Sequence, residues 1–188
     1  MSEQEQRREQ KARFERLARV VTDPVHRYLL RRTNDGMAED VLSETMLVLW
    51  RRIDDVPGLG TGDAPDPDDV LPWCYGVARG CLANADRADR RKLRLVERLI
   101  QHQRPPAHPS DHSDLYAALD ALGAPDREIV RLWAWEGLAP RQIADVIEST
   151  PNAVSIRLHR AKKKLAARLE RKKPSRPGQE VDEGRSSQ

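Results

Sequence analysis

Apolar residues recur every three to four positions along most of the chain, which predicts helices rather than strands. These helical patterns cover residues 11–32, 37–53, 70–100 and 113–165. We expect residues 11–32 to form a pair of helices that breaks near Asp23-Pro24, because proline interrupts a helix interior. Residues 1–10 are almost wholly polar and are expected to be frayed or loosely helical. Long alternating runs rich in Val, Ile and Thr are missing, so the sequence predicts an all-α fold.

Two polar segments divide the chain into expected domains. Residues 101–112, QHQRPPAHPSDH, are rich in proline and predict a flexible linker. One domain would therefore cover residues 11–100 and a second would cover residues 113–170. Residues 171–188 contain few apolar side chains and are expected to form a disordered tail. The predicted architecture is two small helical domains joined by a flexible linker.

The segment 138–165 carries the pattern of a helix-turn-helix. Its inner face is expected to consist of Ile143, Val146, Ile147, Val154, Leu158, Ala161 and Leu165. Ala144 is small enough to lie where two helices cross closely. Thr150 is a good N-cap for the second helix, and Pro151 suits its first position.

The other face of this second helix is polar and basic. Its outward positions are Asn152, Ile156, His159, Arg160 and Lys163. One packed face and one basic face suit the DNA major groove, although charge alone is also typical of a solvated surface helix. The small residue, the capped turn and the outward cations together favour DNA binding.

Charge is distributed unevenly along the chain, although the formal net charge is only +3. Residues 151–173 contain nine Lys or Arg and one acid, whereas residues 36–70 contain nine Asp or Glu and two Arg. This asymmetry predicts one polyanionic partner and one partner that carries cations. Charged residues make up 34% of the chain and aromatic residues only 4%, so any cores are small and aliphatic.

Several functions are not expected from this sequence. Cys74 and Cys81 lie seven positions apart, about 10 Å along a helix, which is too far for a disulfide. We expect both to be buried thiols in a reducing compartment. The histidines near the linker lack cysteines at ligand spacing, so we expect no metal site, and no catalytic residues or cofactor. No signal peptide or membrane span is expected, and the predicted location is the cytoplasm.

Three segments in order resemble the extracytoplasmic-function sigma factors of bacterial RNA polymerase. They are Ala38–Met46 with Leu49–Arg52, then Pro72–Arg79, and then Ile143–Ala161. The family patterns are close to A-E-D-L-V-Q-E-T-F, W-L-x-x-I-A-R-N and E-I-A-x-x-L followed by T-V-K-S-R-L-x-R-A. The resemblance covers about residues 11–170 and implies a region 2 domain followed by a region 4 domain.

The resemblance implies three binding surfaces. The surface for the coiled coil in the largest subunit of core polymerase would contain Glu39, Asp40, Ser43, Glu44 and Leu47. The −10 promoter surface would contain Trp73, Arg79, Gly80, Arg87, Arg90 and Arg91. The −35 surface would contain Arg141, Asn152, Ser155, Ile156, His159, Arg160 and Lys163. An anti-sigma factor is a further implied partner. From the residues alone, Trp73 would more often pack in a helix core than stack on a base, and the acids of residues 39–44 would more often be solvated.

The chain departs from the family pattern at four places. Gly80 stands where the family often has Asn, and Ser155-Ile156 replaces a Lys-Ser pair. Glu148 occupies a turn position that often holds Gly, and would cost about 1 kcal/mol if that residue has a positive φ. The acidic loop 57–69 is expected either to hold a base by its shape or to shield the DNA site.

Two other classes of function were compared with this interpretation. A stand-alone helix-turn-helix regulator would explain the basic C-terminal segment, but it would leave the acidic helix and residues 70–95 without a role. Such a regulator would also bind palindromic half-sites as a dimer. The sequence has no sustained heptad pattern that would form a dimer interface. A nucleic-acid enzyme would need a metal cluster, a phosphate loop or a nucleophile–base pair, and none is recognisable.

Overall fold

The computed structural model describes residues 2–60, 64–97 and 113–172. These residues form seven α-helices and one short 3-10 helix, η1, without a strand among them, which confirms the all-α prediction. The helices are α1 (Glu3–Leu30), α2 (Asp35–Arg51), η1 (Ile53–Asp55), α3 (Pro67–Glu97), α4 (Ser113–Asp120), α5 (Ala124–Ala134), α6 (Pro140–Ile147) and α7 (Pro151–Lys172).

Helix α1 is continuous, so the predicted break at Asp23-Pro24 is wrong. Pro24 lies inside the helix. Side chains at positions 17, 21, 25 and 28 are fully buried on one face of α1. Packing of this face holds the helix together against the local cost of the proline. The N-terminus is also more ordered than expected, because the Ser2 hydroxyl and the Glu5 carboxylate form a capping box.

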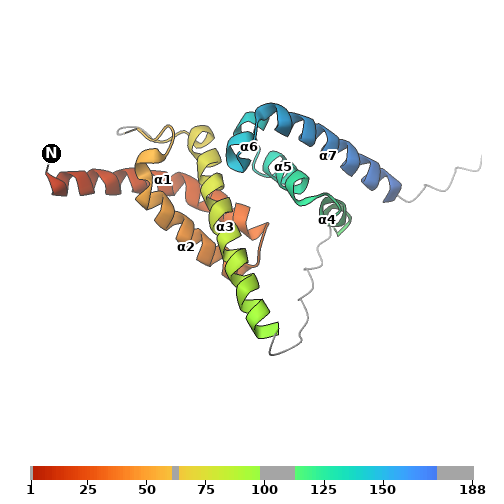
Figure 1. Cartoon of the computed structure of the whole chain (residues 1–188). Helices are drawn as coiled ribbons and strands as arrows, with labels where there is room; N and C mark the ends of the chain where they lie inside the picture. Colours follow the sequence, from red (N-terminus) through yellow and green to blue (C-terminus); the bar gives the residue numbers. More distant parts are fainter. Residues whose placement is uncertain (1, 61–63, 98–112, 173–188) are drawn as a thin grey trace, which may run out of the picture.

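Helices α1, α2 and α3 pack together as the N-terminal bundle (Figure 1). Its core includes Leu17, Val21, Val25, Tyr28, Leu29, Val41, Leu49, Ile53, Val70, Cys74 and Ala78. Thr45 is the one buried polar residue among those described, and its hydroxyl donates to the Val41 carbonyl at 2.7 Å. After η1, Gly58 has a φ of +68°, and a Cβ there would lie 2.9 Å from the Cβ of Asp69. Only glycine therefore fits at this turn into α3.

Helices α4 to α7 form the C-terminal bundle, which contains the predicted helix-turn-helix in α6 and α7. Ala144 is 1% exposed where these two helices cross. Thr150 caps α7 as expected, because its hydroxyl oxygen accepts a bond of 3.2 Å from the Ala153 N–H. Glu148 adopts a φ of 54° in the turn, so the departure from glycine does place a bulky residue in a left-handed conformation.

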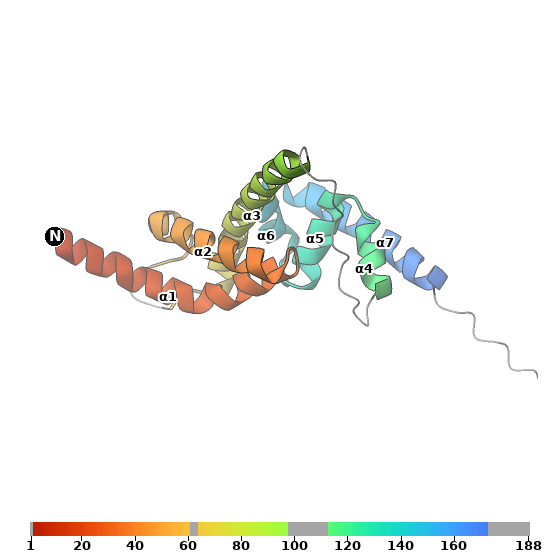
Figure 2. The same ribbon diagram turned by 90° about the horizontal axis from the view of Figure 1, so that it is seen from below.

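The two bundles touch each other along α3 and α6, as Figures 1 and 2 show from two directions. The N-terminal half of α3 lies beside α6, whereas its C-terminal half extends away from the other helices. The domain boundaries given above stay predictions. The expected linker, residues 101–112, and the expected tail beyond Lys172 lie outside the described residues. Helix α7 continues two residues into that expected tail.

The first prediction of the fold concerns Cys74. Its side chain is fully buried, and burial raises the pKa of the thiol to about 12. Because the thiolate is the reactive form, iodoacetamide should label Cys74 at pH 8 at less than about a hundredth of the rate in denaturant. Mass spectrometry of timed labelling measures this ratio. Rapid labelling in the folded chain would contradict the burial described here.

The second concerns the strained turn at Glu148. Replacing Glu148 by Gly should raise the free energy of unfolding by about 0.5–1 kcal/mol, because glycine adopts a positive φ without a Cβ penalty. Asp145→Gly is the matched control, since Asp145 is an exposed residue inside α6 and glycine there should be destabilising. Urea denaturation of the two variants tests the difference in sign, and a loss of stability in both would contradict it.

Candidate nucleic-acid interface

The acidic surface predicted on residues 39–47 lies on α2. Glu39, Asp40, Ser43, Glu44 and Leu47 are all exposed, and the spacing places them within a sector of about 140°. The opposite side of α2 is buried through Ala38, Val41, Thr45 and Leu49. Leu47 is 49% exposed among these acids. The face therefore combines negative charge with an apolar contact point, which suits a partner that carries cations next to apolar groups.

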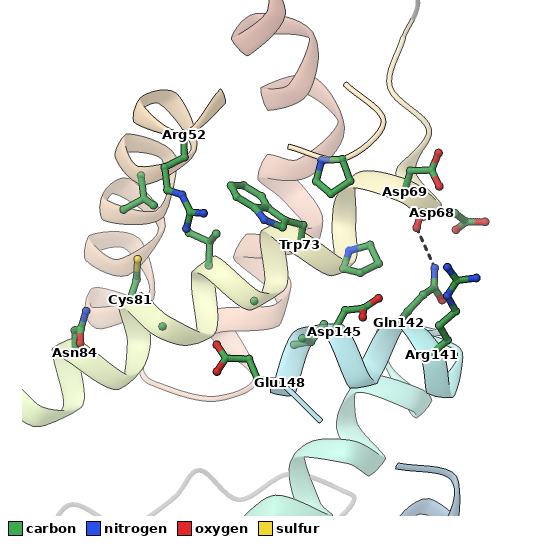
Figure 3. A pocket seen from close by; sticks show the side chains of 17 residues that line it. Arg52, Asp68, Asp69, Trp73, Cys81, Asn84, Arg141, Gln142, Asp145 and Glu148 are labelled. Carbon is green, nitrogen blue, oxygen red and sulfur yellow. Dashed lines mark hydrogen bonds between the residues drawn. The ribbon is translucent and has the colours of Figure 1, made fainter. Parts of the chain in front are cut away.

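A cavity of about 830 Å³ lies between parts of α3 and α6, beside the region where the two helices touch (Figure 3). Trp73, Gly80 and Asn84 line it from α3. Arg141, Gln142, Asp145 and Glu148 line it from α6 and the turn that follows. Gln142 also crosses to α3, where its Nε2 donates to the Asp68 carbonyl at 3.0 Å. One candidate from the −35 group, Arg141, therefore shares this cavity with two candidates from the −10 group.

Trp73 lies at the boundary between the core of the N-terminal bundle and the cavity. It is half-buried against the core of the N-terminal bundle, and its ring also lines the cavity. The guanidinium carbon of Arg52 lies 5.2 Å from the centre of that ring. This distance is within the range of a cation–π contact, so Arg52 helps to hold the indole at the cavity wall. A base that stacks on Trp73 would have to share or displace this arginine.

The predicted −10 residues do not all share one face of α3. At about 100° per residue, Trp73, Gly80, Arg87 and Arg91 fall close together, whereas Arg79 and Arg90 lie roughly 100° away. Burial raises the pKa of Tyr28, and Arg79 is one of the cations whose charge opposes that rise.

Arg87 bonds within its own helix, to the Ala83 carbonyl at 3.1 Å and to Asn84 Oδ1 at 2.6 Å. Arg79, Arg87, Arg90 and Arg91 are all exposed. Asn84, which the sequence analysis did not select, lies on the cavity face and carries an amide that can read a base edge.

Helix α7 presents the outward face that its sequence predicts. Asn152, Ser155, Ile156, His159, Arg160 and Lys163 are all exposed, and Ile156 is 44% exposed. The hydroxyl of Ser155 donates to the Pro151 carbonyl at 2.8 Å, so its proton is already used. Arg157 belongs to the packed side, because its Nε lies 2.9 Å from Asp126 Oδ1.

A basic groove extends this face toward the end of α7, and sequence reasoning missed it. Arg160, Lys164, Arg168 and Arg171 recur at i, i+4, i+8 and i+11, a spacing that signals one helix face. With Lys163, they line a cavity of about 510 Å³ that Ala121 and Leu122 also line. Such closely grouped cations suit the phosphates of a nucleic-acid backbone.

No described helix has both the length and the apolar character that a membrane crossing requires. Within the same part of the chain, no three His, Cys, Asp or Glu side chains are grouped so that they could hold a metal ion.

Part of the chain matches a known family model. Residues 112–165 match sigma-70 region 4, and this segment runs from the start of α4 into α7. No protein of curated function matches the sequence.

Solved structures extend the similarity to the whole fold. The sigma factor RpoE, in complex with the anti-sigma factor NepR from Bartonella quintana, matches with a TM-score of 0.63 and 19% identity over 85% of this chain and 98% of that one. CnrH, in complex with the cytosolic domain of CnrY, matches with a TM-score of 0.53 and 22% identity over 85% and 89%. The PhyRSL-NepR complex from Sphingomonas sp. Fr1 matches with a TM-score of 0.56 and 17% identity over 87% and 95%.

The region 4 match covers the helix-turn-helix, and the structural similarity covers both bundles. Residues 112–165 therefore form a sigma-70 region 4 segment, and the chain as a whole shares the fold of RpoE and CnrH.

Proposed function

We propose that this chain is an RNA polymerase sigma factor of the extracytoplasmic-function type. It would bind core polymerase through α2, engage and open −10 promoter DNA with α3, and read the −35 duplex with α7. The observation that carries the proposal is the region 4 match, which ends in a helix with an exposed and mostly basic outward face. The acidic face of α2 and the aromatic and amide groups along α3 supply the other two surfaces.

In the proposed −35 complex, the outward face of α7 enters the major groove. Arg160 is a candidate for bidentate bonds to guanine, and Ile156 is a candidate for contact with a thymine methyl group. Lys164 would contact phosphates, because it is a point charge at the side of the same face, whereas Lys163 lies near the middle of that face. Base contacts would supply specificity, and the phosphate contacts would set the position of the helix on the duplex.

In the proposed −10 complex, α3 works by binding and does not need a catalytic group. Unstacking a base costs a few kcal/mol, and contacts to the extruded base and the single-stranded backbone offset that cost. Trp73 and Asn84 would meet the base, while Arg87 and Arg91 would follow the backbone along the same face. This mode of action is that of a binding protein rather than an enzyme.

The relatives suggest one further partner. RpoE of Bartonella quintana is seen with an anti-sigma factor. By analogy, we propose that an anti-sigma factor also binds the present chain. The proposed location is the cytoplasm, where polymerase and promoter DNA are both available.

The proposed polymerase surface predicts the effect of charge reversal on α2. Asp40→Arg or Glu44→Arg should weaken binding of the full chain to purified core polymerase about tenfold or more, because each places like charges against a cationic partner. Asp23→Arg is the matched control, since Asp23 is an exposed acid on α1 and the net charge changes equally. Full binding by both α2 variants in a pull-down would rule out this surface.

The −35 model distinguishes a base contact from a phosphate contact. Arg160→Ala should cost about 1–3 kcal/mol on the preferred duplex and relax the choice of one base. Lys164→Ala should weaken all duplexes alike and reduce the salt dependence of log K by about one. Fluorescence anisotropy on duplexes selected from a random library, at several salt concentrations, measures both effects. An equal loss on every sequence for Arg160→Ala would reassign it as a phosphate contact.

A further inference from the structure

The basic groove lies where the second half of α7 passes the turn between α4 and α5 (Figures 1 and 2). Its volume of about 510 Å³ is within the range of small-molecule sites. The wall that α7 contributes carries five cations, Arg160, Lys163, Lys164, Arg168 and Arg171. Within the described chain, no Asp or Glu lines the groove. Such a one-sided set of charges creates a positive potential that selects an anion with several charges.

The charges around the groove have partners elsewhere and do not neutralise it. Asp120, at the end of α4, lies 3.2 Å from Arg127 of α5. Arg127 also donates to the carbonyl oxygens of Leu119 and Leu122, both at 3.2 Å, so these acceptors of the turn are already bonded. None of the five groove cations forms an ion pair with another described residue. Their charge is therefore available to a ligand.

Two of these cations are guanidinium groups on successive turns of α7. Nη1 of Arg168 is shielded from solvent and has no hydrogen-bond partner among the described residues. A buried N–H without a partner is unfavourable, and an anion in the groove would supply the missing acceptor after a small shift of the side chain. Arg171 is exposed, and its Nε donates to the Ala167 carbonyl at 3.1 Å, which holds its guanidinium along the helix. Guanidinium groups bind phosphate oxygens in pairs.

The position of Arg168 separates the groove from the proposed −35 surface. Lys163 lies near the middle of the outward face of α7, and Arg168 lies about 140° further around the helix. A duplex seated on the outward face would meet Lys163 and the positions beside it, but not the far side of the helix. Arg160 and Lys163 belong both to that face and to the groove. The −35 contact therefore does not account for the inner part of the groove.

The size of the groove favours linked phosphates over an acidic peptide. Each phosphate offers three acceptor oxygens and carries more charge than a carboxylate, whereas a peptide supplies at most one carboxylate per side chain. Five cations around a small-molecule volume thus match a short chain of phosphates. Ala121, Leu122 and Ala167 add a small apolar wall, which suits the base or sugar of a nucleotide.

We propose that the basic groove binds a compact ligand with two or more linked phosphates, either a nucleoside polyphosphate or an inorganic oligophosphate. Because Arg160 and Lys163 are shared, a ligand in the groove weakens binding of the −35 duplex, and the duplex weakens binding of the ligand by the same factor. This consequence rests on the proposed function, whereas binding of the ligand is a property of the chain alone.

The site is tested with inorganic triphosphate as the probe. Isothermal titration of the full chain at constant ionic strength should show one site, and Arg168→Gln and Arg171→Gln should each weaken it about tenfold or more by removing charge-assisted bonds. Lys162→Gln is the matched control, because it removes the same charge from α7 while Lys162 lies 4.0 Å from the centre of the Trp133 ring, outside the groove.

The exposed position of Arg171 protects this test from a failure of folding, which circular dichroism also checks. Absence of triphosphate binding by the parent chain, or an equal loss in all three variants, would overturn the site.

The class of ligand is tested by comparing probes. Inorganic monophosphate should bind at least about tenfold more weakly than triphosphate, because it reaches fewer of the cations. ATP that binds more tightly than triphosphate would assign the site to nucleotides, and equal binding would assign it to the inorganic chain; both results support the proposal. An octaglutamate peptide that binds as tightly as triphosphate would overturn it in favour of a surface for acidic peptides.

The link to DNA is tested by fluorescence anisotropy on a duplex selected from a random library. Saturating triphosphate should weaken the duplex severalfold relative to NaCl of the same ionic strength. In Arg168→Gln this effect should disappear while the affinity for the duplex is retained. An unchanged duplex affinity with triphosphate bound would overturn the link, and an equal loss of both ligands in Arg168→Gln would make the groove a DNA contact. If no duplex is selected but triphosphate still binds, the proposed function fails and the groove keeps its ligand.

Discussion

The contact between the two bundles is the constraint on which the other features depend. The chain contains few aromatic residues, and its buried core is mostly aliphatic and runs through both bundles. At the junction this core is joined by ion pairs of Arg32 with Glu128 and Glu136 and by the backbone approach at Gly76.

Helix α3 carries two functions on two faces. Val70, Cys74 and Ala78 are buried in the N-terminal bundle, while Trp73 and Gly80 line the cavity beside α6. The core face fixes the helix, so the cavity face is held in position without further support. The candidate residues on α2 and α7 are exposed in the same arrangement.

Local features were predictable from the sequence, and long-range features were not. The cap at Thr150 and the positive φ at Glu148 depend on residues within a few positions, and the fold of the helix-turn-helix follows from them. The continuity of α1 through Pro24 was missed, because tertiary burial outweighs the local preference. Arg31 pairs with Glu136, which lies 105 positions away in the sequence. The periodic pattern of apolar residues does not indicate such a distant partner.

The candidate site shows the same division. The spacing on α7 located its exposed face, and the same spacing would have found Lys164 and Arg168 had the pattern been followed to the end of the helix. On α3, in contrast, a list of cations did not reveal which of them share a face with Trp73. Neither pattern indicated that Arg141 and Trp73 would line one cavity, since that depends on how α6 meets α3.

The most direct measurement of the central claim is run-off transcription with purified core polymerase and a library of promoter sequences. The account predicts that adding this chain produces transcripts from a subset of templates that share one −10 and one −35 element. Absence of transcripts from every template, together with binding of the chain alone to palindromic duplexes, would contradict it and favour a stand-alone regulator.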